Sequence, residues 1–292
     1  MNSQKSKYKK NCHWRNRYKK MISISGKEWK EYKIPKRLID KYSIDFNISE
    51  NLSKFYLTRN FNKEDILIKN IVIDNLNIFS DNKDFLLGTK IIIDIIKNKK
   101  KTLIFGDYDV DGVSSITILS SYFRHIGHPF KYLIPDRFID GYGPNIKLLE
   151  QNLDKEVDNI IFLDCGSNSH DVINYLNTKK IRSIIIDHHI INDFHMPKSD
   201  VHINPTKNNQ KFIENNVCAA TLTFFFVDLV NKKLNSKFKL DDYFVFSLIS
   251  TICDLMPLKG FNRKILTIGF KNLVIKNKGL KKLISNNLKK KL

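Results

Sequence analysis

The sequence predicts an α/β fold in which a mainly parallel sheet is flanked by helices. From residue 101 onward, short apolar runs alternate with stretches of helical periodicity, which is the pattern of β-α-β units. The apolar runs are unbroken Ile, Leu and Phe, as expected when helices cover both faces of a sheet. Three of these runs end on polar clusters, which predicts a site at one edge of the sheet.

The predicted elements follow one another along the chain. Residues 83–101 have apolar side chains at helical spacing and Lys at the C-terminal end, which suits the helix dipole. Another predicted helix opens with Pro144, which the first turn of a helix tolerates. Strands are predicted at 101–105, 130–134, 159–164, 182–187 and in a run ending at Asn204. Helices are predicted around 64–70 and at 83–101, 113–126, 144–153, 170–180, 218–233 and 241–253.

Charge divides the chain into three parts. The net charge is +20 over 292 residues, and residues 1–41 and 259–292 each contribute +11, which leaves −2 for the middle. We therefore predict a basic N-terminal segment (1–45) that is disordered or partly ordered, above all over residues 1–20. A central domain (46–258) follows. The last segment, 259–292, is predicted to be basic and helical, either the end of this domain or the start of a linker to a second one.

The basic ends indicate a polyanionic partner. Segments rich in Lys and Arg bind nucleic acid because they release the counterions that its phosphates hold. The alternative is that both ends are solvated tails, since only 8 of the 50 basic residues are Arg.

The cysteines and the apolar segments bear on the cellular compartment. Four widely spaced cysteines, with no C-x-x-C pair, argue against a disulfide framework or a zinc ribbon and favour a reducing cytoplasm. We interpret Cys165 and Cys253 as small core residues. The longest apolar stretch, 217–230, is too short for a membrane span and contains Asp228. We therefore expect a cytoplasmic protein with no membrane partner and no signal peptide.

Three acids stand at alternate positions directly after the first predicted strand of the sheet, in the stretch GDYDVDG (106–112). Neighbouring carboxylates repel one another, so a positive group is expected among them. Asp-x-Asp-x-Asp-Gly also begins a calcium EF-hand, but position 12 of that loop would be Ile118 instead of Glu. Neither Gly-rich nucleotide-binding pattern, G-x-x-x-x-G-K-[ST] or G-x-G-x-x-G, occurs.

Further acids and histidines follow the later elements. Asp164 ends one strand, Asp187, His188 and His189 end another, and Asp254 follows an apolar helix. Carboxylate and imidazole ligands suit Mn²⁺ or Mg²⁺, and two such ions are the usual apparatus of phosphoester hydrolysis. Taken singly, an Asp at a strand end is more often a helix cap or turn residue, and a His pair is more often structural.

Four short motifs then point to a family. The stretches GDYDVDG, FLDCGS, DHH and TICDLMPL resemble, in order, the motifs of the DHH phosphoesterase superfamily, and most closely those of RecJ-type single-strand-specific DNA exonucleases. The resemblance runs from about residue 50 to the C-terminus and implies a DHH phosphoesterase domain. Supporting stretches are PDRFIDGYGPN (135–145), INPT (203–206), CAATLTFFF (218–226) and FNRKILTIGFKNL (261–273).

The resemblance implies a role for each candidate site residue. Two ions, Mn²⁺ or Mg²⁺, would be held by Asp109, Asp111, Asp164 as the bridge, His188 and Asp254. Asp107 would lie just outside these ligands, as an acceptor or a base for the attacking water. His189 would sit beside the site and touch phosphate. Arg137 would contact phosphate through its planar fork, the alternative being a salt bridge to Asp136 or Asp140.

The loop around the first acids should be compact. Gly106 and Gly112 are expected to let the backbone turn tightly. The helix beginning near Val113 should point its positive N-terminus at the site. Some superfamily members carry a His ligand at the position of Phe105, so this sequence departs from them there.

The implied activity is hydrolysis of single-stranded DNA from the 5′ end to mononucleotides, in DNA repair and recombination. Two alternatives stay open: a DHH-type hydrolase of short oligonucleotides or other small phosphate esters, and a truncated nucleic-acid-binding fragment without activity. RecJ-type enzymes continue into a second domain with a Gly-Gly-His motif, whereas this chain has no Gly-Gly pair. The expected partners are single-stranded DNA and either a separately encoded C-terminal half or a single-strand-binding protein.

Overall fold

The computed structural model describes residues 21–29, 32–61, 63–66, 77–153, 156–191, 196–207, 214–271, 273 and 275–289. The chain divides into two compact units, Met1–Leu67 and Ile68–Leu292. The disorder predicted for residues 1–20 lies outside the described residues.

The described residues of the first unit form a short hairpin and three helices. In the hairpin, β1 (Met21–Ile22) pairs antiparallel with β2 (Glu28–Trp29). The domain boundary predicted between residues 45 and 46 falls within the first helix, whereas the division between the units follows residue 67. Of the helix predicted around 64–70, residues 67–70 lie outside the described part. The helices are α1 (Lys36–Phe46), α2 (Glu50–Thr58) and α3 (Lys63–Ile66).

The second unit is built on a parallel sheet that has five strands in the described residues. Their order is β4-β3-β5-β6-β7, and every neighbouring pair is parallel. The predicted α/β class is confirmed, and each strand begins and ends within one residue of the predicted position. The strands are β3 (Thr102–Gly106), β4 (Phe130–Leu133), β5 (Asn159–Leu163), β6 (Arg182–Ile186) and β7 (Val201–Ile203).

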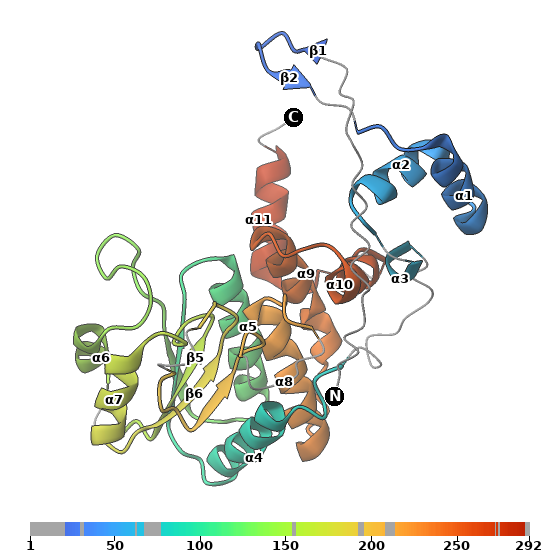
Figure 1. Cartoon of the computed structure of the whole chain (residues 1–292). Helices are drawn as coiled ribbons and strands as arrows, with labels where there is room; N and C mark the ends of the chain where they lie inside the picture. Colours follow the sequence, from blue (N-terminus) through green and yellow to red (C-terminus); the bar gives the residue numbers. More distant parts are fainter. Residues whose placement is uncertain are drawn as a thin grey trace, which may run out of the picture. The chain divides into compact units, whose positions relative to one another are not determined.

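Helices cover both faces of this sheet (Figure 1). Leu103 and Phe105 of β3 pack into the core under α6 (Ile146–Asn152) and α7 (His170–Thr178), whereas Ile104 between them packs into the core on the other face. The unbroken apolar runs of β3 and β5 are explained because their side chains are buried between the two helical layers. At the edge of the sheet, Lys131 and Tyr132 of β4 are exposed. The helices of the other face are α4 (Lys83–Lys97), α5 (Val110–His125), α8 (Ala219–Leu234), α9 (Phe244–Cys253) and α10 (Gly260–Lys271).

The strand order reverses its direction between β3 and β5. The chain leaves β3 through α5 to β4 at one edge of the sheet, then returns through α6 to β5 on the other side of β3. Ligands of such sheets bind at this reversal, outside the carboxyl ends of the strands. Asp107 follows β3 and Asp164 follows β5, so the first two acid motifs flank this point.

Several helix boundaries differ from the prediction for local reasons. Helix α5 begins three residues earlier than predicted because Asp109 caps it. Helix α6 begins after Asn145, whose side chain is the cap, so Pro144 precedes the cap instead of opening the helix. The helix predicted over 241–253 is a 3-10 turn, Leu240–Tyr243, followed by α9.

Three other expectations concern residues outside the sheet. Phe261, Ile265 and Ile268 of α10 are buried in the core, so the start of the basic C-terminal segment belongs to the second unit, and α11 (Lys278–Lys289) follows it. Cys165 is buried as expected, but Cys253 is exposed, so the core interpretation is wrong for Cys253. Among the described residues, no helix is both long enough and apolar enough to cross a membrane.

Candidate metal centre

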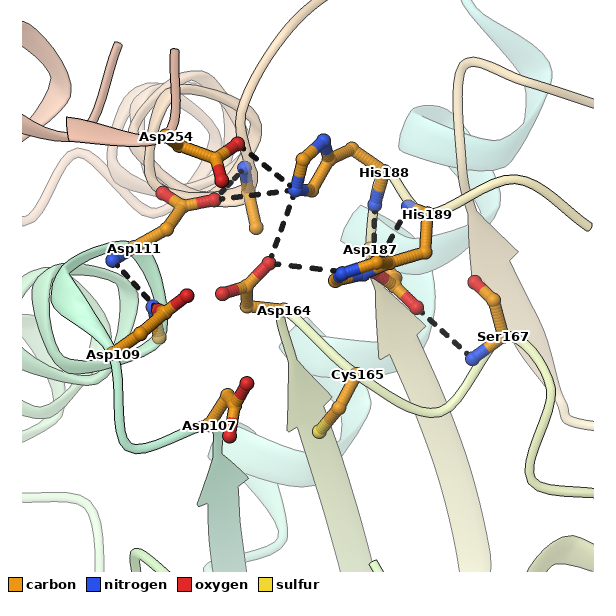
Figure 2. Close-up of polar contacts among 12 residues, drawn as sticks. Asp107, Asp109, Asp111, Asp164, Cys165, Ser167, Asp187, His188, His189 and Asp254 are labelled. Atoms are coloured by element: carbon orange, nitrogen blue, oxygen red, sulfur yellow. Dashed lines mark hydrogen bonds and ion pairs between the residues drawn. The ribbon is translucent and has the colours of Figure 1, made fainter. Parts of the chain in front are cut away.

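Acidic and histidine side chains gather beyond the carboxyl ends of β3, β5 and β6 (Figure 2). Asp107, Asp164 and Asp187 each directly follow one of these strands. The hydrogen bonding between neighbouring strands continues into these residues. The backbone N–H of Asp107 donates to the carbonyl of Leu163 at 3.3 Å, and the backbone N–H of Asp164 donates to the carbonyl of Ile186 at 2.9 Å. Neighbouring strands therefore carry the three acids to one edge, as predicted.

Asp109 begins α5 and closes its first turn. Its Oδ1 accepts hydrogen bonds from the backbone N–H groups of Asp111 and Gly112, both at 2.9 Å. This turn packs closely on β3, because a Cβ on Gly112 would lie 2.7 Å from the backbone nitrogen of Asp107. A Cβ on Gly106 would likewise lie 2.6 Å from a side chain of α5. Both glycines are therefore required by close packing, and neither has the positive φ of a special turn.

Asp111 is buried in α5 and binds the start of a distant helix. Its carboxylate accepts hydrogen bonds from the backbone N–H groups of Ala219 at 2.6 Å and Ala220 at 2.8 Å, the first residues of α8. Cys218, at the cap position of α8, makes no side-chain capping bond, so Asp111 satisfies these N–H groups instead. No local signal could have predicted a cap supplied from 108 positions earlier in the chain.

Asp164 and His188 lie at the middle of the cluster (Figure 2). Asp164 has φ +60°, a left-handed conformation that is uncommon for a residue other than glycine. The Nε2 atom of His188 lies 3.2 Å from Oδ1 of Asp164, 3.3 Å from Oδ2 of Asp254 and 3.6 Å from Oδ2 of Asp111. His188 therefore meets carboxylates from three separate elements of the fold.

The potential ligand atoms fall into three groups, and within each group they all lie within 4.8 Å of one another. Two of the groups share no residue, and the third connects them through Asp164 and His188. The structure thus brings together every predicted site residue except Arg137. The groups are Asp107, Asp109 and Asp164; Asp111, His188 and Asp254; and Asp164, His188 and His189.

Four buried atoms of this cluster have no hydrogen-bond partner in the described part of the chain. They are both carboxylate oxygens of Asp164, Nε2 of His188 and Oδ2 of Asp254. Buried polar atoms are normally paired, so these atoms point to a bound group. Carboxylate and imidazole donors bind divalent cations, and a set in which carboxylates predominate suits Mn²⁺ and Mg²⁺ more than a metal that prefers thiolate ligands. The residues present therefore fit a divalent cation.

Burial and mutual repulsion act against ionisation of these carboxylates. Burial, followed by the neighbouring charges of Asp111 and Asp109, raises the pKa of Asp164 to about 12. Burial likewise raises the pKa of Asp107 and of Asp254. A cation would reverse this effect because it favours the ionised form.

Asp187, to which the sequence analysis gave no role, orients both histidines. Its Oδ1 accepts hydrogen bonds from the backbone N–H of His188 and from Nδ1 of His189, both at 2.7 Å, and its Oδ2 accepts one from the backbone of Ser167 at 3.0 Å. Burial acts to raise the pKa of Asp187, but the hydrogen bonds from His189 and Ser167 outweigh burial and lower it. The bond to Asp187 raises the pKa of His189. The only signal in the sequence was the position of Asp187 at a strand end.

The loop 135–145 reaches the cluster through Tyr142, whose hydroxyl lies 3.0 Å from Nε2 of His189. Arg137 of the same loop is exposed, and its guanidinium lies 5.5 Å from the centroid of the Tyr108 ring. Among the described ion pairs, none joins Arg137 to the neighbouring acids of its loop. Arg137 therefore stands next to the first acid motif but outside the ligand groups.

Comparison with known proteins identifies the family. A family model described as the DHH family, N-terminal domain, matches residues 101–250, just over half of the chain. This chain belongs to the DHH family. The DHH match contains the residues from Asp107 to His189, and Asp254 follows it closely.

Relatives of this DHH chain carry the name RecJ. The single-stranded-DNA-specific exonuclease RecJ of Haemophilus influenzae is 27% identical over 185 residues, which cover 60% of this chain and 32% of that protein. The protein of the same name from Bacillus subtilis is 28% identical over 190 residues, which cover 65% of this chain and 23% of that protein. The chain thus spans about a third or less of the length of these curated relatives.

Solved structures share the fold of the DHH domain. RecJ of Thermus thermophilus in complex with Mn²⁺ superposes with a TM-score of 0.62 at 20% identity, covering 80% of this chain and 32% of that one. A second exonuclease RecJ structure, bound to manganese, gives a TM-score of 0.57 at 23% identity, covering 63% of this chain and 46% of that one. The predicted resemblance to RecJ-type proteins is confirmed, and the structures support it at the level of fold.

Proposed function

We propose that this DHH domain is a metal-dependent phosphoesterase that hydrolyses single-stranded DNA from the 5′ end to mononucleotides, in DNA repair and recombination. The observation that carries the proposal is a pair of separate ligand groups, one around Asp109 and one around Asp111. They are joined where His188 approaches Asp164 to 3.2 Å. Two adjacent cation sites of this kind are the usual apparatus of phosphoester hydrolysis.

Five side chains would hold two Mn²⁺ or Mg²⁺ ions. Asp109 and Asp164 belong to one ligand group, and Asp111, His188 and Asp254 make up the other. Asp164 lies between the groups, which supports its role as the bridging ligand. The chemistry supplied by ions bound there is Lewis acidity, which lowers the pKa of a water and offsets charge on phosphoryl oxygens.

Other side chains would position the phosphate and the attacking water. Asp107 is buried beside Asp109 and would accept a proton or a hydrogen bond from the water. His189 is held at Nδ1 by Asp187, and its raised pKa favours the protonated ring, which can donate a hydrogen bond to a phosphate oxygen. Arg137 would contact phosphate from the rim, because its guanidinium is exposed.

The substrate is proposed from the relatives and from charge. Both curated relatives described above are named single-stranded-DNA-specific exonucleases. The two ends of this chain, each carrying +11, would attract a polyanion. The proposal also includes, as a partner, a separately encoded C-terminal half or a single-strand-binding protein. The described cysteines are free, which is consistent with the proposed cytoplasmic location.

The proposal is tested with 5′-labelled single-stranded DNA and the purified chain in Mn²⁺. We expect release of labelled mononucleotide that stops when the metal is chelated. Asp164→Ala should lower the rate at least about a hundredfold, the loss typical when a group that stabilises transition-state charge is removed. The matched control is Asp171→Ala, an exposed acid of α7 that belongs to none of the ligand groups.

Three other outcomes would change the conclusion. Hydrolysis of bis(p-nitrophenyl) phosphate without hydrolysis of DNA would favour the alternative of small phosphate esters. DNA binding that weakens steeply with salt, with no hydrolysis in Mn²⁺ or Mg²⁺, would favour a binding fragment. Release of label only after addition of a second polypeptide would assign part of the substrate site to that partner.

A further inference from the structure

A pocket of about 280 Å³ opens beside the candidate metal centre. It is lined by the loop from Tyr142 to Pro144, by the turn from Cys165 to Ser169, and by Asp187 and His189, all within the second unit. Figure 2 shows Ser167 of this turn on the side of Asp187 and His189 that faces away from Asp109 and Asp111. The pocket therefore lies next to the ligand groups and shares His189 with one of them.

The lining of the pocket has little free charge. Among the described residues that line it, Asp187 is the only carboxylate, and both of its oxygens already accept hydrogen bonds from Ser167, His188 and His189. Neither Lys nor Arg is among these lining residues. A phosphate placed there would lack the cations that usually bind it, so the pocket suits a neutral polar group.

The size and the walls of the pocket suit a planar ring. Cavities of about 150 Å³ admit benzene, so this pocket is large enough for a base of one or two rings. The ring of Tyr142 forms part of one wall and is exposed, which offers a face for stacking. Ser169 also lines the pocket, and although it is the cap residue of α7, its side chain makes no capping bond to that helix. That hydroxyl is free to bind the edge of a base.

His189 connects the pocket to the ligand groups. Its ring lines the pocket, and its Nδ1 lies 4.0 Å from Oδ1 of Asp164. A single nucleotide can therefore place its base on one side of His189 and its phosphate on the other.

From this geometry we infer that the pocket holds the nucleobase of the nucleotide whose phosphate binds at the metal centre. The inference rests on the proposed function, since it requires a phosphate at the ligand groups. It adds a subsite in which Tyr142 stacks on the base and Ser169 binds its edge. The protein should therefore recognise a mononucleotide by its base as well as by its phosphate.

The test compares two phosphates that differ only in the base, deoxyadenosine 5′-monophosphate and 2-deoxyribose 5-phosphate. Their binding to the full chain is measured by calorimetry in Mn²⁺. We expect the wild type to bind the nucleotide at least tenfold more tightly than the sugar phosphate. Ser169→Trp, which fills the pocket, should remove this difference and leave the affinity for the sugar phosphate unchanged.

Two control variants separate filling of the pocket from other effects. Ser169→Ala removes the hydroxyl without filling the space, so it should keep most of the preference for the nucleotide. Asn174→Trp adds the same bulk on the exposed side of α7 and should keep the full preference for the nucleotide. If Ser169→Trp does not fold, as judged by circular dichroism, Asn168→Trp at the neighbouring lining position replaces it.

The possible results separate this inference from the proposed function. Equal binding of the two phosphates by the wild type, or a preference that survives filling of the pocket, overturns the inference. If the chain hydrolyses DNA but does not prefer the nucleotide over the sugar phosphate, the proposed function stands and the pocket has no role in binding the base. Binding of neither phosphate in Mn²⁺ would refute the phosphate site, and with it both proposals.

Discussion

Replacing Asp164 with Asn should stabilise the protein in a chelator, although it should abolish binding of metal. Asp164 is 1% exposed, and neither of its oxygens has a hydrogen-bond partner in the described part of the chain. Burial and the charges of Asp111 and Asp109 raise its pKa to about 12. In a chelator no hydrogen bond therefore offsets the burial of this side chain. Asn is neutral at every pH and takes up no proton on folding.

The magnitude follows from proton linkage. With a folded pKa far above 7, Asp164 is protonated in the folded protein at pH 7 but ionised in the unfolded chain, where its pKa is about 3.9. Folding at pH 7 must therefore take up a proton, which costs about 1.4 kcal/mol for each pH unit between 3.9 and 7, or roughly 4 kcal/mol. This cost grows as the pH rises from 4 towards the folded pKa. Asn takes up no proton on folding, so roughly 4 kcal/mol is the upper limit of the increase in the free energy of unfolding.

The assay is urea denaturation at pH 7, with EDTA and with Mn²⁺, for the wild type and Asp164→Asn. In EDTA the variant should be more stable, by up to about 10 °C if the same change is followed as a shift in Tm. In Mn²⁺ the wild type should gain stability, because only the folded state has the binding site. The variant should gain little. An Asp164→Asn protein less stable than the wild type in EDTA would refute the reasoning, since the carboxylate would then be making a favourable contact without metal.

Three further predictions concern residues around the site and far from it. Asp111→Ala should lower the free energy of unfolding by roughly 3 kcal/mol even in EDTA, because two buried N–H groups at the start of α8 lose their acceptor; unchanged urea midpoints would contradict this. Gly112→Ala should lower Mn²⁺ affinity at least tenfold in a calorimetric titration, since its Cβ would meet the Asp107 backbone at 2.7 Å and shift the first acid motif. Burial lowers the pKa of His128 to about 4, so below pH 6.5 the unfolded chain binds a proton that the folded protein does not, and the free energy of unfolding decreases as the pH is lowered. In urea titrations, His128→Gln should recover roughly 2 kcal/mol of the stability lost between pH 7 and 5. Equal pH slopes for both proteins would refute the assignment.

The sheet could be predicted because its signals are local. The strands β3, β5 and β6 are rich in apolar residues, and the Asp that directly follows each of them marks its end, so these strands begin and end close to the predicted residues. The gathering of Asp107, Asp164 and His188 also followed from the sequence, since parallel strands deliver their carboxyl ends to one edge. The roles of these residues as ligands came from the resemblance and stay a prediction.

The features that were missed depend on contacts between distant parts of the chain. The bonds from Asp111 to α8 join residues 108 and 109 positions apart, and no pattern within α8 indicates a cap supplied from outside. The role of Asp187 depends on the turn of Ser167, which approaches it only in the folded sheet. Cys253 was misplaced because a free Cys was interpreted as a small core residue, whereas this one lies at the exposed end of α9.

The spread of the ligand groups along the chain has a consequence for biosynthesis. Their residues come from the end of β3, the start of α5, the ends of β5 and β6 and the end of α9, so the set runs from Asp107 to Asp254. The group of Asp111, His188 and Asp254 is complete only when the last of these residues has left the ribosome and α9 has packed. A nascent chain would therefore lack the proposed two-ion centre, and under this proposal the uptake of metal would report that the domain has finished folding.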